Sequence, residues 1–116
     1  MKITMLVDNN TIIDSYYVGE PAVSYFIEES GHKYLFDTGY SDVFLQNAVA
    51  MNISLDDLSG VILSHGHNDH TRGLTYLIKQ KFQKMLMKPR LIAHPEVFLT
   101  RSEDGAEIGC PIKKVY

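Results

Sequence analysis

The segment Ser64-His65-Gly66-His67-Asn68-Asp69-His70-Thr71 carries three of the five histidines of the chain, together with an aspartate. Imidazole nitrogen and carboxylate oxygen are both good ligands for zinc, iron and manganese. His65 and His67 are two residues apart, so in an extended backbone their rings point to the same side and can share one metal ion. Asp69 and His70 follow a turn at the expected start of a helix, and can point towards a second ion. The spacing H-x-H-x-D-H therefore predicts a site for one or two divalent metal ions. Zinc is the expected metal, with iron or manganese as alternatives.

A strand and a helix must position this cluster. The apolar run Val61-Ile62-Leu63 precedes it and predicts a strand over residues 60–64, and the residues that follow predict a helix over 72–80. The end of a strand in an α/β protein is a common place for working residues. The helical H-E-x-x-H spacing of many zinc proteases is absent from the sequence.

The remaining elements alternate between strand and helix along the chain. We predict strands over residues 2–7, 22–28, 33–37 and 90–94, a polar loop containing Asp8-Asn9-Asn10, and a hairpin turn at Ser30-Gly31-His32. A helix that begins at Ser41 or Asp42 would carry Val43, Phe44, Ala48 and Met51 on one side. The mixture indicates an α/β fold.

Length and composition limit the function classes. A chain of 116 residues fits one small domain, residues 1–116, and the formal net charge of −3 gives no electrostatic reason to expect nucleic acid or an anionic membrane as partner. No apolar run approaches the ~20 residues that a membrane-spanning helix needs. The single cysteine, Cys110, cannot form an internal disulfide, which favours a reducing compartment, the cytoplasm by default.

Several stretches make the sequence resemble the metallo-β-lactamase superfamily. The H-x-H-x-D-H cluster follows a strand as in that family, and Leu35-Phe36-Asp37-Thr38-Gly39 resembles the strand end found upstream of it. The runs Leu6-Val7-Asp8-Asn9 and Leu91–Phe98 resemble one branch, hydrolases related to a dihydropterin phosphate synthase. The resemblance covers nearly the whole chain. It implies the N-terminal half of an αβ/βα sandwich, a mixed sheet with flanking helices.

The resemblance also implies a chemistry. In this family a hydroxide held between metal ions attacks a phosphorus or carbonyl carbon. It implies that His65 and His67 hold the first metal and that Asp69 and His70 hold the second, while Asp69 also orients the nucleophile. We expect a metal-dependent hydrolase acting on a small-molecule phosphoester, and a pterin-related phosphate synthase is left open. A redox di-iron role is disfavoured, because His67 stands where that branch commonly carries glutamate.

Two further residues are candidates for supporting the ligands or contacting substrate. Asp37 matches a position that family members use near the metals, although an aspartate before Thr38-Gly39 can equally be a turn residue. His94 ends a predicted strand at the expected active-site edge. It follows His70 too closely to be the usual third ligand of the family.

The family's other ligands come from the second half of its fold, which would follow residue 116. Half a fold would expose an apolar sheet face, which we expect to be lined by Tyr25, Ile27, Leu35, Val61 and Leu63. Two copies in a homodimer, or a separate chain, are the expected sources of the missing half. The alternative is a catalytically inactive, truncated module of the same fold that dimerises.

Overall fold

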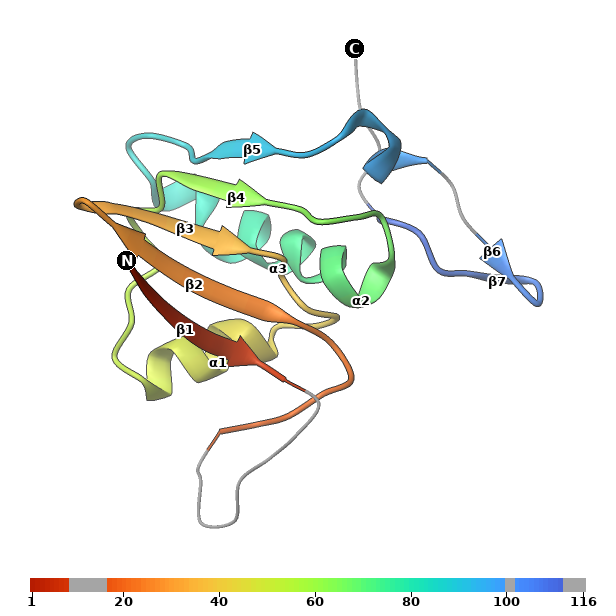
Figure 1. Ribbon diagram of the computed structural model, residues 1–116, viewed down its shortest axis with the longest axis horizontal. Coiled ribbons are helices and arrows are strands. Elements are labelled where there is room, and N and C mark those ends of the chain that lie inside the picture. Colours follow the sequence, from red (N-terminus) through yellow and green to blue (C-terminus); the bar gives the residue numbers. More distant parts are fainter. Residues whose placement is uncertain (9–16, 100–101, 112–116) are drawn as a thin grey trace.

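A five-stranded mixed sheet forms the centre of the computed structural model, which describes residues 1–8, 17–99 and 102–111 (Figure 1). Its strands lie in the order β1 (Lys2–Val7), β2 (Ser24–Glu29), β3 (His32–Phe36), β4 (Gly60–Ile62) and β5 (Arg90–Ile92). The β1–β2 and β2–β3 pairs are antiparallel, whereas β3, β4 and β5 run parallel to one another. The carboxyl ends of these last three strands therefore meet at one edge of the sheet.

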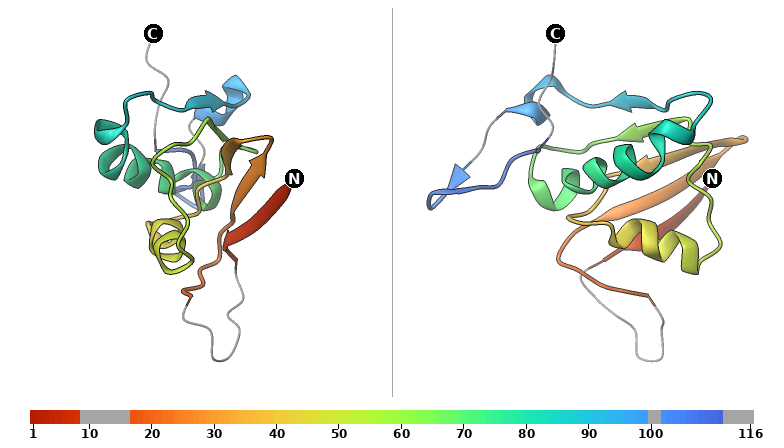
Figure 2. Two further views of the ribbon diagram at one scale, coloured as in Figure 1. Left: turned by 90° about the vertical axis from the view of Figure 1, so that its left-hand side faces the viewer. Right: turned by 180° about the vertical axis from the view of Figure 1, so that it is seen from behind.

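Helices cover one face of the sheet, as the view from behind in Figure 2 shows. They are α1 (Val43–Ala50) and α3 (Gly73–Gln80), and the short α2 (Asn68–Thr71) directly precedes α3. The two 3-10 helices are η1 (Phe82–Lys84) and η2 (Pro95–Phe98), and a small hairpin of β6 (Ser102–Glu103) and β7 (Ala106–Glu107) follows. Within the described part of the chain, no helix lies on the other face of the sheet.

The hydrophobic core lies between the sheet and these helices. Phe26, Leu35 and Val61 contribute to it from three neighbouring strands, and they face Phe44 of α1 and Leu77 of α3. All five side chains are at most 2% exposed. Burial of these apolar side chains, at ~25 cal/mol per Å² removed from water, is the main contribution to the free energy that holds the sheet and the helices together.

The strand register corrects one prediction about the open face. Leu35 is paired with Phe26 on one side and with Val61 on the other, so the three side chains share the face that the helices cover. Leu35, Val61 and Leu63 were expected on the exposed face, and this was wrong, because all three are buried in the core. Tyr25 and Ile27 do lie on the uncovered face and are half-buried.

The predicted elements agree with the structure to within a few residues. The α/β class, the mixed sheet and the helices over 43–50 and 73–80 are confirmed. The strand predicted over 60–64 ends at Ile62, because the backbone N–H of Ser64 donates to the side chain of Asp37 and not to a neighbouring strand. The β6–β7 hairpin was not predicted, although Asp104-Gly105, with φ of 51° and 82°, is a strong hairpin-turn signal. Asn9 and Asn10 of the predicted polar loop lie outside the described residues.

No helix among the described residues is both long enough and apolar enough to cross a membrane.

Candidate metal centre

The candidate site lies where β3 and β4 end. Asp37 follows β3, and its backbone N–H donates to the carbonyl of Ile62 at 2.8 Å, which ties the two strand ends together. Its φ of 58° is in the left-handed region, where aspartate and asparagine are tolerated better than most residues. This turn directs the carboxylate inwards, and the Asp37 side chain is only 1% exposed.

Three polar groups surround the Asp37 carboxylate. Oδ1 accepts the backbone N–H of Ser64 at 2.8 Å, and Oδ2 accepts the hydroxyl of the same serine at 2.5 Å. Oδ2 also lies 2.7 Å from Nδ1 of His70. A buried carboxylate is costly unless it is hydrogen-bonded, and here each oxygen has at least one donor. Asp37 is therefore the group that holds the start of the histidine segment against the end of β3.

These hydrogen bonds fix the orientation of two imidazole rings. Because the Asp37 carboxylate only accepts, Nδ1 of His70 carries the proton of that ring. The Ser64 hydroxyl gives its one proton to Asp37, so it accepts from Nδ1 of His65, 2.8 Å away. In the neutral tautomer that these hydrogen bonds select, Nε2 of each ring is free of a proton, which is the form that binds a metal ion.

His65, Asp69 and His70 form the group of potential metal ligands that the structure brings together. One ligand atom from each lies within 4.8 Å of the others. The ring centroids of His65 and His70 are 4.1 Å apart, and Nε2 of His70 lies 3.6 Å from Oδ2 of Asp69. Burial, and then the charges of His70 and His67, lower the pKa of His65 below its ordinary 6.5. Two imidazoles and one carboxylate are a donor set that suits zinc, iron or manganese.

His67 lies beside this group but outside it. Its ring is edge-on to that of His65, with 4.9 Å between centroids. Its backbone carbonyl accepts the Thr71 hydroxyl at 3.0 Å, so His67 also fixes the first turn of α2. Three of the four predicted ligands are thus brought together, and the assignment of His65 and His67 to one ion and of Asp69 and His70 to another stays a prediction.

Sequence reasoning missed the residues that hold α2 and α3 against the end of β3. The carbonyl of His70 accepts both the backbone N–H of Thr38 at 2.8 Å and its hydroxyl at 3.1 Å. The N–H of Gly73 donates to the carbonyl of Gly39 at 3.0 Å. A Cβ at Gly73 would lie 1.9 Å from the Thr38 carbonyl oxygen, so only glycine permits this approach. A glycine at the start of a helix, three residues after the histidine cluster, is the sequence signal that could have indicated this close packing.

A shallow hollow adjoins the cluster. Its cavity volume is ≈ 350 Å³, and Tyr40, Asn68, Arg72 and Glu107 are among the residues that line it. The Arg72 guanidinium lies 4.5 Å above the centre of the Tyr40 ring, an arrangement that holds a cation in place at the rim.

His94 is exposed at the start of η2, where its Nδ1 accepts the backbone N–H of Glu96 at 3.2 Å. This contact caps the short helix. His94 is outside the group of three potential ligands, and its predicted supporting or substrate role stays a prediction.

Comparison with known proteins identifies the family. The family model of the metallo-beta-lactamase superfamily matches residues 17–102. The fold and the histidine cluster agree with that match, and the chain belongs to the metallo-β-lactamase superfamily. Solved structures of this fold include the MIM-2 metallo-beta-lactamase, with a TM-score of 0.58 at 24% identity over 82% of this chain and 38% of that one.

Three similar proteins are each 30% identical to this chain. The crystal structure of Tm1679, a metal-dependent hydrolase of the beta-lactamase superfamily, has a TM-score of 0.72 at 30% identity and covers 93% of this chain and 36% of that one. Protein MJ0448 of Methanocaldococcus jannaschii is 30% identical over 92% of this chain and 40% of its own length. The 7,8-dihydropterin-6-methyl-4-(beta-D-ribofuranosyl)-aminobenzene-5'-phosphate synthase of the same organism is 30% identical over 84% of this chain and 34% of its own length. The chain therefore spans between a third and two fifths of the length of these relatives.

Proposed function

We propose that this chain carries one half of the active site of a metal-dependent hydrolase that acts on a small phosphoester in the cytoplasm. The observation that carries the proposal is the group of His65, Asp69 and His70, with ligand atoms within 4.8 Å of one another. Membership of the metallo-β-lactamase superfamily supports it, as does the likeness to a metal-dependent hydrolase at 30% identity.

The residues present fit a divalent metal ion. His65 and His70 each have Nδ1 occupied by a hydrogen bond and Nε2 available, and Asp69 supplies an oxygen ligand. When bound, such an ion lowers the pKa of water towards neutrality and polarises the bond under attack. With a 42% exposed side chain, Asp69 can reach a water molecule as well as the ion, which suits it to accept a proton from that water and orient it.

One cation near the cluster, Arg72, supports a phosphoester as substrate. Arg72, held over Tyr40 at 4.5 Å, is a cation at the rim of the hollow beside the cluster. Guanidinium groups bind phosphate oxygens in pairs, so Arg72 can hold the substrate while the ligand cluster faces the scissile bond. A pterin-related phosphate substrate would satisfy the same contacts.

Three ligands of one chain can hold one catalytic ion but are too few for two. Catalytic zinc sites in general use three protein ligands for each ion and leave one position open, and a site of two ions needs more. We propose that a second half or a second subunit supplies the additional ligands. The second candidate is an inactive module that keeps the fold.

Metal binding by matched histidine variants tests the proposal. We would add Zn²⁺, Fe²⁺ or Mn²⁺ to the purified chain and measure bound metal per chain and the shift of the thermal midpoint. His65→Ala and His70→Ala should each weaken binding at least about tenfold, because each removes a ligand. His32→Ala is the control, since His32 lies at the opposite end of β3 and contacts Ser59. Equal losses in His32→Ala and His70→Ala would refute a metal site at the cluster.

Hydrolysis of bis(4-nitrophenyl) phosphate by the metal-loaded protein tests the reaction separately. Arg72→Ala should raise KM for this substrate more than it lowers kcat, since Arg72 is proposed to bind phosphate rather than to take part in bond cleavage. A protein that binds metal at the cluster and hydrolyses no phosphoester would fit the inactive module instead.

A further inference from the structure

The carboxylate of Glu20 holds the loop between β3 and α1. Its Oε1 accepts the backbone N–H of Tyr40 at 2.9 Å and that of Ser41 at 3.3 Å, and its Oε2 accepts the Ser41 hydroxyl at 2.6 Å. The donors belong to two consecutive residues that follow Glu20 by 20 and 21 positions in the chain. Hydrogen bonds to a carboxylate are roughly twice as strong as those between neutral groups, so these contacts fix the backbone of Tyr40.

The carboxylate can approach this loop because residue 39 is glycine. Gly39 has a φ of 72°, and a Cβ there would lie 2.9 Å from Oε1 of Glu20. The N–H of Gly39 donates to the carbonyl of Val23 at 2.9 Å. The N–H groups of residues 39, 40 and 41 are thus all accepted by residues 20–23. The segment 20–23 therefore fixes the position of the loop that follows β3.

The backbone of Glu20 is itself fixed. Its N–H donates to the carbonyl of Asp8 at 3.2 Å, directly after β1, and its carbonyl accepts the N–H of Ala22 at 2.8 Å. Ala22 is 5% exposed and belongs to the hydrophobic core. The side chain of Glu20 reaches Ser41 just before the start of α1, the end of a helix that favours an anion. Glu20 is therefore anchored to the sheet and can hold the loop in one position.

Tyr40 connects this anchored loop to the hollow beside the histidine cluster. The Arg72 guanidinium lies 4.5 Å from the centre of the Tyr40 ring, and both residues line the hollow of ≈ 350 Å³. Tyr40 is 40% exposed, so packing holds its ring only in part, and the hydrogen bond from its N–H to Glu20 contributes to its placement. A shift of the loop would move the Tyr40 ring away from Arg72, which belongs to a different element.

We propose that Glu20 is a positioning residue for phosphate binding: through Tyr40 it holds the Arg72 guanidinium in the orientation that binds a phosphate group. The proposal rests on the phosphoester substrate proposed above. Glu20 is not part of the lining of the hollow, so it acts through Tyr40. A flexible arginine loses side-chain freedom when it binds an anion, and an arginine already held over a ring loses less. Pre-organisation of one long side chain changes affinity by about three- to tenfold.

The side-chain NMR signals of Arg72 in the purified full chain test the positioning without any hydrolysis. Protons above an aromatic ring are shifted upfield by its ring current, so the Hε signal of Arg72 should be upfield and Tyr40→Leu should remove that shift. Glu20→Ala should move the signal most of the way to its position in Tyr40→Leu. Glu20→Gln should keep the shift, because its amide oxygen can accept both backbone N–H groups while its NH2 donates to the Ser41 hydroxyl.

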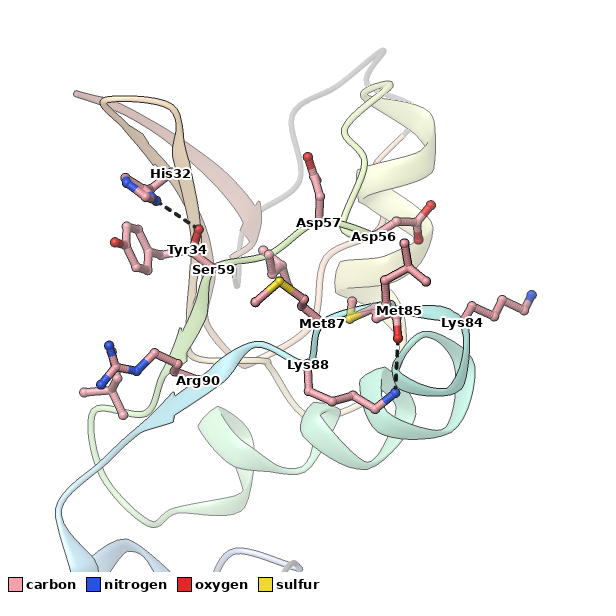
Figure 3. Close-up of a pocket in the computed structure, with 13 residues that line it drawn as sticks. His32, Tyr34, Asp56, Asp57, Ser59, Lys84, Met85, Met87, Lys88 and Arg90 are labelled. Atoms are coloured by element: carbon pink, nitrogen blue, oxygen red, sulfur yellow. Dashed lines mark hydrogen bonds between the residues drawn. The ribbon is translucent and has the colours of Figure 1, made fainter.

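Two controls distinguish a local loss of position from a general loss of structure. Gln46→Ala removes an exposed amide that donates to Asp42 at 2.9 Å beside the start of α1, and it should leave the Arg72 signal unchanged. Arg90 is the internal reference, since it lines a different hollow at the start of β5, at the opposite end of the parallel strands. Figure 3 shows Arg90 projecting to the same side as Tyr34. Its signals should stay the same in every variant.

Titration with inorganic phosphate, without added metal and followed through the Arg72 signals, tests the consequence for binding. The dissociation constant should rise about three- to tenfold in Glu20→Ala and less than about twofold in Glu20→Gln. In a Tyr40→Leu background, Glu20→Ala should add less than about twofold, because the ring through which Glu20 acts is already absent. An equal loss of affinity in both backgrounds would show that Glu20 does not act through Tyr40 and would overturn the proposal.

The two readouts separate this proposal from the phosphoester substrate. An Arg72 signal that is the same in the wild type and in Glu20→Ala would overturn the role of Glu20, whatever the protein binds. A change in Gln46→Ala as large as that in Glu20→Ala would overturn it as well. Arg72 signals that do not respond to phosphate in the wild type would refute Arg72 as the phosphate-binding residue, and with it the effect of Glu20 on affinity.

Discussion

Replacing Gly73 by alanine tests how closely the ligand segment is packed against the end of β3. The added Cβ would lie 1.9 Å from the Thr38 carbonyl oxygen and 2.9 Å from Cε1 of Phe44. Carbon and oxygen ordinarily touch at ~3.3 Å or more, so α3 and the β3 end must separate by roughly 1.4 Å. That movement would break the hydrogen bond from Gly73 to Gly39 and strain the two from Thr38 to the carbonyl of His70.

The expected loss of stability follows from these contacts. Three hydrogen bonds at about 1 kcal/mol each, with overpacking of about 1–3 kcal/mol, outweigh the gain of about 1 kcal/mol in helix propensity. We expect the free energy of unfolding to fall by about 3–5 kcal/mol, measured by urea denaturation. Gly105→Ala in the β6–β7 turn is the control. No atom lies within 4 Å of its added Cβ, and only the cost of a positive φ, about 1 kcal/mol, applies. Gly73→Ala with a loss no larger than that of Gly105→Ala would refute the close approach.

Two further substitutions separate ligand support from stability. Asp37→Asn keeps a residue that tolerates a φ of 58°, but its NH2 group would face a donor, either the backbone N–H of Ser64 or the Ser64 hydroxyl and His70 Nδ1. Metal affinity should fall 10–100-fold in calorimetric titration, and an unchanged affinity would show that Asp37 does not orient the ligands. Asn47→Leu removes the buried amide that bonds the Leu6 carbonyl at 2.7 Å and the backbone of Val18 at 2.8 and 2.9 Å. Unfolding free energy should drop by about 3 kcal/mol with little change in metal affinity per folded chain, and parallel losses in both would contradict the separation.

Local pattern was sufficient to predict the order of the elements. Alternating and β-branched residues mark β2 and β3, and the apolar run before the histidines marks β4, so each strand falls within two residues of its predicted limits. The side on which a strand presents its residues was harder to predict. Leu35 and Val61 could be assigned to a face only from the pairing of Leu35 with Phe26 and of Val61 with Leu35, and these pairs are 9 and 26 positions apart in the chain.

The candidate site shows the same division between local and long-range information. The identity of the ligand cluster is a local pattern, and the structure brings His65, Asp69 and His70 together as expected of neighbours in sequence. The support of Asp37 for His70 crosses 33 positions, and that of Thr38 crosses 32. A single sequence cannot show such pairs, because each donor and acceptor has many alternative partners at that separation.

The contacts that orient the candidate ligands come from the two residues that directly follow β3. Asp37 and Thr38 are both at most 1% exposed. Each forms a hydrogen bond with His70. The orientation of the His65 and His70 rings is therefore fixed by hydrogen bonds made within this one chain.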